Sequence, residues 1–214
     1  MNLSITRRTY LQLFGFLTLT TVILWPDPSY YALLRYGTVP TLFTALPYIL
    51  PASIMISSLY LGVADPPERR DGPSLLRREL LSTLTILSLT LPYAVLALTV
   101  TNTALLRLLP LVAVLLPAAL LYNSLGILVA ATVPLPTLRH VVAWAAGILL
   151  LPATALYLPA ANPVVAAANT TGSAALLSAG LWVPELTPFP LLVAGAVPLL
   201  GAGILTTVVI LWKG

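Results

Sequence analysis

Charge is concentrated in one short part of this chain. The fifteen residues 65–79 hold four of its ten basic side chains and four of its six acidic ones, and long apolar runs lie on either side. A charged side chain at the middle of a membrane costs roughly 2.5 to 3.5 kcal/mol on insertion scales. Residues 65–79 are therefore expected in water or at a membrane face, between two membrane-embedded segments.

The composition indicates where the rest of the chain lies. Of the 214 residues, 59% are hydrophobic and 7% are charged, whereas roughly a quarter of the residues in a soluble domain are charged. The sequence therefore predicts an all-α integral membrane protein. With no cysteine and one histidine, we expect no metal site and no cofactor bound by this chain alone. The net charge is +4 and comes mainly from arginines. These arginines are spread along the chain, so no nucleic-acid partner is expected.

Six apolar runs predict membrane-spanning helices, for which about 20 residues are typical. Their ranges are 10–25, 39–63, 80–100, 108–133, 141–161 and 191–211. Between the fifth and sixth runs, two apolar pieces at 164–168 and 174–183 flank a polar tip at 169–173. Each piece is too short to cross, which predicts an outer re-entrant or interfacial hairpin between helices 5 and 6. Residues 1–214 are expected to form one transmembrane domain.

The basic residues predict the orientation of this domain. If the amino terminus is cytoplasmic, eight basic residues fall inside and two, Arg35 and Arg107, fall outside. Cytoplasmic loops carry an excess of Lys and Arg, so both termini are expected in the cytoplasm. No ionisable residue is expected at mid-depth of a span, which argues against a proton- or ion-coupled transporter. No catalytic residue is expected either, since a Gly-x-Ser-x-Gly turn is missing from the sequence.

The end of the charged stretch predicts a short amphipathic helix. Residues 73–81 read PSLLRRELL, and Pro73 suits a first helical position while leucines and arginines separate onto two faces. Two interpretations stay open. The helix either docks a soluble partner and passes movement into the second and third spans, or it rests on the inner membrane surface with its arginines touching lipid phosphates.

Other residues admit two interpretations each. Trp182 and Glu185 are candidates for an outer gate or a subunit contact, or else belong to an interfacial belt and a solvated loop. His140 either anchors the fifth helix beside Arg139 or acts as an axial ligand or gate for a haem-like substrate. Within the fourth span, small and polar residues are expected to serve close helix packing; these are Asn123, Ser124 and Gly126.

With six spans, a charged loop after the second and an outer hairpin after the fifth, the chain resembles the membrane subunits of type-2 ABC exporters. Among them it is most similar to the small cytochrome c maturation permeases of the haem-exporter type. The local motif is an acidic Asp-Gly turn followed by leucines, here ERRDGPSLL at 68–76. The chain departs from the family pattern in three ways. Pro73 interrupts the run after Gly72, the expected Glu is displaced to Glu79, and the amphipathic segment before the first span is almost missing.

The resemblance implies a permease-like subunit in a bacterial inner membrane or the mitochondrial inner membrane. A separate ABC ATPase subunit would bind ATP and dock on the charged loop as a coupling helix, in a homodimer or hetero-complex. Haem would be a candidate substrate of the complex, with further haem-handling membrane subunits as partners. The expected partner-binding residues are Glu68, Arg69, Arg70, Asp71, Gly72, Leu75, Leu76, Arg77, Arg78 and Glu79.

Two other functions stay open. The chain could instead be a non-catalytic structural or accessory subunit of a larger membrane complex, in which the proline-rich spans serve packing. It could also be a membrane subunit that binds a small vitamin-like ligand. Isolation in a fixed complex without an ATPase favours the first of these, and a ligand retained on purification favours the second.

Overall fold

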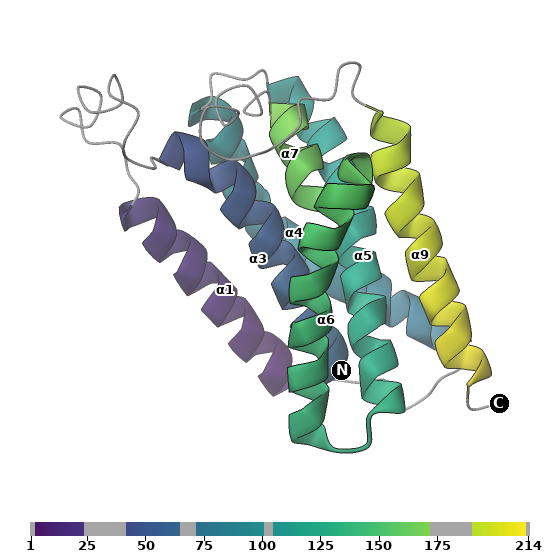
Figure 1. Ribbon diagram of the computed structural model, residues 1–214. Helices are drawn as coiled ribbons and strands as arrows, with labels where there is room; N and C mark the ends of the chain where they lie inside the picture. The colour runs from purple at the N-terminus through teal and green to yellow at the C-terminus, as the bar shows by residue number, and fades with distance from the viewer. Residues whose placement is uncertain (1–2, 24–41, 65–71, 101–104, 172–189, 213–214) are drawn as a thin grey trace.

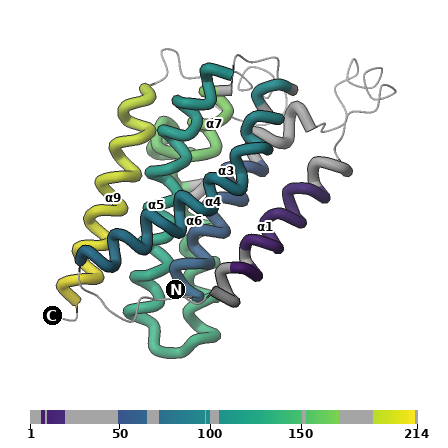
Figure 2. Tube along the Cα trace, turned by 180° about the vertical axis from the view of Figure 1, so that it is seen from behind, coloured from purple at the N-terminus to yellow at the C-terminus, as the bar shows by residue number. Residues whose placement is uncertain are grey.

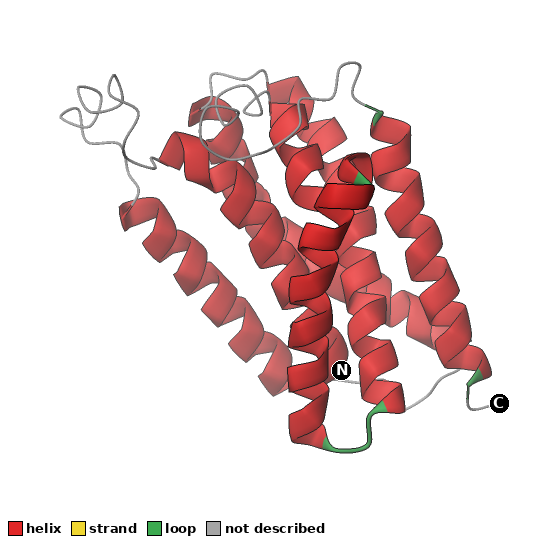
Figure 3. Ribbon diagram, viewed as in Figure 1, coloured by secondary structure: helices red, strands yellow, loops and turns green. Residues whose placement is uncertain are grey.

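A computed structural model describes residues 3–23, 42–64, 72–100, 105–171 and 190–212. In these ranges the regular structure is helical throughout, with no strand (Figure 3). The long helices run side by side as one bundle (Figure 1). In chain order the elements are α1 (Leu3–Ile23), α3 (Leu42–Ala64), α4 (Gly72–Val100), η1 (Leu105–Arg107), α5 (Leu108–Thr132), α6 (Pro136–Tyr157), η2 (Pro159–Ala161), α7 (Pro163–Thr171) and α9 (Leu191–Leu211).

Within the described ranges, four helical segments are long and apolar enough to cross a membrane. They are Gly72–Leu96, Leu105–Thr132, Pro136–Tyr157 and Leu191–Leu211. In α1 and α3 the described apolar stretches are shorter, Tyr10–Leu19 and Ile49–Ala64. The expected all-α membrane architecture is thus confirmed, with four candidate spans.

Helix α5 forms the centre of the bundle. It packs most extensively against α3 and α9 and also contacts α4, α6 and α7. Its buried residues lie on all sides of the helix, as expected for a helix surrounded by others; they include Leu111, Leu115, Ala118, Ala119 and Tyr122. The small residues among them let neighbouring helices approach closely.

Helix α4 crosses the bundle obliquely. It begins beside the end of α9, passes α5 and α3, and reaches α1 (Figure 2). Near its far end, the Tyr93 hydroxyl lies 2.6 Å from Thr18 Oγ1 of α1, and its ring meets Phe14 edge-on at 6.4 Å between centroids. Helix α4 therefore links the first and last helices of the described chain.

Helix α7 contains the first apolar piece of the predicted hairpin, residues 164–168. Asn162 caps it, because its Oδ1 accepts hydrogen bonds from the backbone N–H groups of Val164 and Val165 at 2.9 and 3.0 Å. Ala166 and Ala168 are fully buried, and the helix packs against α3 and α5. The prediction of a polar tip from residue 169 is wrong, because α7 continues through Thr171. Residues 172–189 lie outside the described ranges.

Three helix starts differ from the predicted spans. Helix α1 begins at Leu3 instead of residue 10, and α6 begins at Pro136 instead of residue 141. The short helix predicted at 73–81 is helical as expected, but it is continuous with the span predicted from residue 80, so that α4 begins at Gly72. In each case polar residues that were predicted to lie outside the span form the first turns of the helix. Proline is favoured at the start of a helix, because the backbone N–H group that it lacks would have no hydrogen-bond partner within the helix at that position.

Basic residues gather at one end of the bundle. Helices α1, α4 and α6 begin at this end and α9 ends there (Figure 1). We call it the basic end, because five of the six arginines in the described ranges belong to its helix termini: Arg7, Arg8, Arg77, Arg78 and Arg139. The sixth, Arg107, lies at the opposite end and donates a hydrogen bond to the Thr170 carbonyl at 3.3 Å.

Candidate functional site

The segment expected to bind a partner forms the first two turns of α4. Residues 68–71 lie outside the described ranges, and Gly72 is the first helical residue. From there the segment presents two faces. Leu76 is 59% exposed and Arg77 is exposed. On the other face Leu75 is fully buried and packs with Ile127 of α5 and Val209 of α9.

Glu79 lies on the buried face of this segment. Its exposed fraction is 2%, so the expectation that residues 65–79 lie in water or at a membrane face did not foresee that this carboxylate is buried between helices. Residue 79 follows Leu75 by four positions and precedes Ser82 by three, and this spacing places all three on one side of a helix. Ser82 is buried too. The helical period, and not the density of charge, decides where Glu79 points.

Thr206 of α9 binds the Glu79 carboxylate. Its Oγ1 donates toward both carboxylate oxygens, 3.0 Å from Oε2 and 3.2 Å from Oε1. The same hydroxyl lies 3.3 Å from Ser124 Oγ of α5, which donates to the Leu120 carbonyl at 2.9 Å. One hydroxyl proton is thus shared between two oxygens of a group that has about four acceptor positions.

A second branch of polar contacts joins the same turn of α4 to α5. Ser82 Oγ donates to the Glu79 carbonyl at 3.0 Å, and Asn123 Nδ2 donates to Ser82 Oγ at 2.6 Å. With Thr206 and Ser124, these residues form what we call the Glu79 cluster. It connects three helices through side chains that are all buried. A displacement of α4 along its axis must therefore break hydrogen bonds to both α5 and α9.

Close backbone contact fixes α5 next to this cluster. Gly62 of α3 and Gly126 of α5 face each other, and a Cβ on Gly62 would lie 3.0 Å from the Gly126 Cα and would overlap the Asn123 carbonyl oxygen. A Cβ on Gly126 would overlap the Leu59 carbonyl oxygen in turn. The close packing predicted for Gly126 is confirmed.

Glu79 lies inside the bundle, but not at its centre. It is seven residues after Gly72, and Thr206 is five residues before Leu211, which places the cluster roughly 7 to 10 Å from the basic end at 1.5 Å per residue. Glu79 also falls within the span-length segment Gly72–Leu96. Glu79 is thus an ionisable residue inside a candidate span, and such residues commonly mark functional positions.

The groups of the Glu79 cluster can exchange a proton and rearrange their hydrogen bonds. A carboxyl group can hold or release a proton, and hydroxyl groups can turn between donating and accepting a hydrogen bond. Both kinds of group meet here, away from bulk water. The cluster can therefore change its hydrogen-bond pattern without a change in the helix backbone, which suits a contact that must be remade when helices move.

The other predicted site residues fall in two groups. Trp182 and Glu185 lie outside the described ranges. His140 lies in the first turns of α6, where its Nδ1 is 2.9 Å from the Pro136 carbonyl and its ring is 5.8 Å from that of Tyr60. Arg139 Nε donates to the Val133 carbonyl at 2.6 Å. In the part of the chain that the structure describes, no three His, Asp or Glu side chains come together as a metal site would require.

These features define the chain as an all-α, multi-pass membrane protein with the buried Glu79 cluster near its basic end. A search of protein-family models, curated proteins and solved structures finds no match to the chain.

Proposed function

We propose that this chain is the permease subunit of an ABC-type complex in an inner membrane. The first turns of α4 are the contact for a separate ATPase subunit, and the basic end faces the cytoplasm. Haem is the substrate to test first, with further haem-handling membrane subunits as partners, on the strength of the resemblance to cytochrome c maturation permeases. The chain itself hydrolyses nothing and supplies helix movement.

One observation carries this proposal: α4 is a single helix with an exposed start and an anchored interior. Leu76 and Arg77 are exposed at the basic end, while Glu79 is bonded to α9 in the next turn. The helix then continues without interruption to Val100. A partner that pushes on the exposed face therefore acts directly on the Glu79 cluster and, through it, on α5 and α9.

Arg77 provides the sharpest test of the partner contact. It is exposed, whereas Arg78 is half-buried, so Arg77→Glu changes the surface charge with little effect on packing. We expect this variant to weaken ATPase binding by roughly tenfold, a typical effect of removing a charged contact at an interface, and to lower ATP hydrolysis by the purified complex. Arg7→Glu is the matched control, because Arg7 is also exposed at the basic end but lies on α1.

The outcome separates the proposed function from its main alternative. If Arg77→Glu leaves both assembly and ATP hydrolysis unchanged, α4 is not the docking helix. If the chain is isolated in a fixed complex that holds no ATPase, it is a structural or accessory subunit instead.

A further inference from the structure

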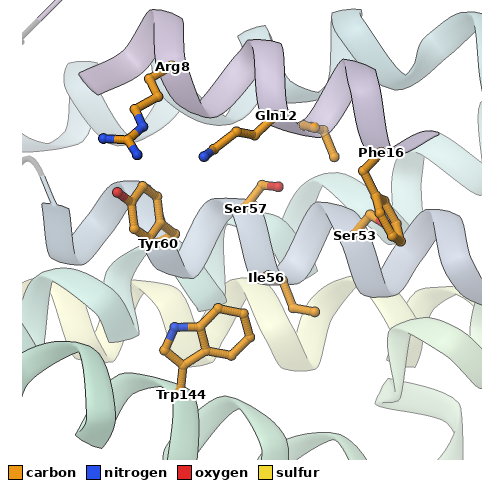
Figure 4. A pocket seen from close by; sticks show the side chains of 9 residues that line it. Arg8, Gln12, Phe16, Ser53, Ile56, Ser57, Tyr60 and Trp144 are labelled. Atoms are coloured by element: carbon orange, nitrogen blue, oxygen red, sulfur yellow. The ribbon is translucent and has the colours of Figure 1, made fainter. Parts of the chain in front are cut away.

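A crevice opens on the side of the bundle between α1, α3 and α6. Its volume is about 450 Å³, which falls within the range of roughly 300 to 1,000 Å³ typical of small-molecule sites. Helix α1 supplies Arg8, Gln12 and Phe16, α3 supplies Ser57 and Tyr60, and α6 supplies Trp144 (Figure 4). Phe16 is 53% exposed and Trp144 is 42% exposed, so the crevice is open along its outer side.

The charged and amide side chains of the crevice lie at one end, and at the other end Phe16 lies beside Ser53 (Figure 4), whose hydroxyl donates to the Ile49 carbonyl at 2.6 Å. Arg8 and Gln12 extend from α1 toward α3 and lie near Tyr60, whereas Phe16 lies two turns further along α1 (Figure 4). The Arg8 end belongs to the basic end of the bundle, since α1 begins there. From Arg8 to Phe16 the crevice follows α1 for roughly 12 Å at 1.5 Å per residue. The Arg8 end of the crevice therefore matches the headgroup layer of a membrane, and the Phe16 end matches the hydrocarbon layer.

The polar groups at the crevice are available to a ligand. The structure shows no hydrogen bond from the side chains of Arg8, Gln12, Ser57 or Tyr60 to another described residue. A guanidinium group near hydrocarbon is costly unless it meets an anionic or polar partner. The apolar part, with Phe16 and Ile56, would be filled by an alkyl chain in a bilayer.

We propose that the crevice binds one anionic glycerophospholipid. Its phosphate lies against Arg8, with Gln12 and Tyr60 as further hydrogen-bond donors, and an acyl chain runs along Phe16 and Ile56. Trp144 lines the α6 side of the crevice, and indole rings are favoured at membrane interfaces. Basic pockets between helices on the inner side of a membrane suit anionic headgroups, and a guanidinium can bond two phosphate oxygens at once. This site is separate from the contact on α4.

Binding of phosphatidylglycerol, compared with phosphatidylcholine of the same acyl chains, tests the proposal. The full chain is purified in detergent, each lipid is titrated, and bound lipid is counted by native mass spectrometry. We expect phosphatidylglycerol to bind more tightly than phosphatidylcholine. Arg8→Ala should weaken phosphatidylglycerol binding by roughly tenfold, as expected for a lost charged hydrogen bond. Gln12→Leu should weaken it less.

Arg7→Ala is the matched control. It removes the same charge from the same turn of α1, but Arg7 does not line the crevice, so phosphatidylglycerol binding should stay within about twofold of the unaltered protein. Thermal unfolding of each variant checks that the bundle is intact. The proposal is overturned if Arg7→Ala weakens binding as much as Arg8→Ala, if Arg8→Ala has no effect, or if the two lipids bind equally.

Discussion

Replacing Thr206 by valine tests whether the Glu79 cluster holds the bundle together. Valine keeps the shape of threonine but removes the hydroxyl group that lies 3.0 and 3.2 Å from the Glu79 oxygens. The carboxyl group then loses its donor from α9 while it stays buried at 2% exposure. Ser124 and Arg78 also interact with this carboxyl group, so the substitution removes one of its partners and leaves its desolvation less fully compensated.

Two magnitudes bound the expected loss of stability. Hydrogen bonds between neutral side chains in membrane helices contribute about 0.6 kcal/mol on average, since the unfolded chain in the membrane also finds partners. A buried polar group left without its partner costs about 1 to 3 kcal/mol, and a charged one more. Because Glu79 is ionisable and buried, we expect Thr206→Val to lower the free energy of unfolding by about 2 kcal/mol.

Reversible unfolding in mixed detergent micelles measures this change. Thr207→Val is the matched control, because Thr207 is exposed and its hydroxyl donates only to the Gly203 carbonyl of its own helix, at 2.8 Å. Its expected cost is below about 0.5 kcal/mol. In a Glu79→Leu background, Thr206→Val should also cost little, since both partners are then apolar. Equal losses for the two threonine variants, or an unchanged Thr206→Val loss in the Glu79→Leu background, would refute the reasoning.

Two further predictions concern packing and capping. Gly126→Ala should destabilise the bundle by about 2 to 3 kcal/mol, because the added Cβ meets the α3 backbone; Gly203→Ala, where the Cβ meets open space, should be neutral or stabilising in the same unfolding assay. Asn162→Ala should weaken α7 by about 1 kcal/mol through loss of the cap, seen as faster amide hydrogen exchange at Val164 and Val165; unchanged exchange there would contradict the capping role.

Long apolar runs predicted the helices well where their ends coincide with a change of composition. Residues 191–211 were predicted as a span, and α9 covers the same residues. Residues 108–133 were predicted, and α5 covers Leu108–Thr132. Each run is long and apolar and has proline next to one end, and the backbone hydrogen bonds of such a run can be satisfied in a membrane only within a helix.

The amphipathic pattern at 73–81 predicts the first turns of α4 as a helix, and α4 includes these residues, but the burial of Glu79 on one face of these turns was not predicted. Arg77 and Arg78 mark the stretch as water-exposed when residues are taken by composition alone. The spacing of Leu75, Glu79 and Ser82 contains the missing signal, since these residues share one face. The partner of that face was not predictable, because Thr206 lies 127 residues away in sequence and only the packing of α9 brings it close.

Native mass spectrometry of the complex isolated through a tag on this chain tests the proposed function most directly. We expect a complex that contains an ATPase subunit, and we expect Arg77→Glu to lose this subunit while Arg7→Glu retains it. A stable assembly with no nucleotide-hydrolysing subunit, unaffected by either change, would contradict the proposal that α4 is the contact for an ATPase.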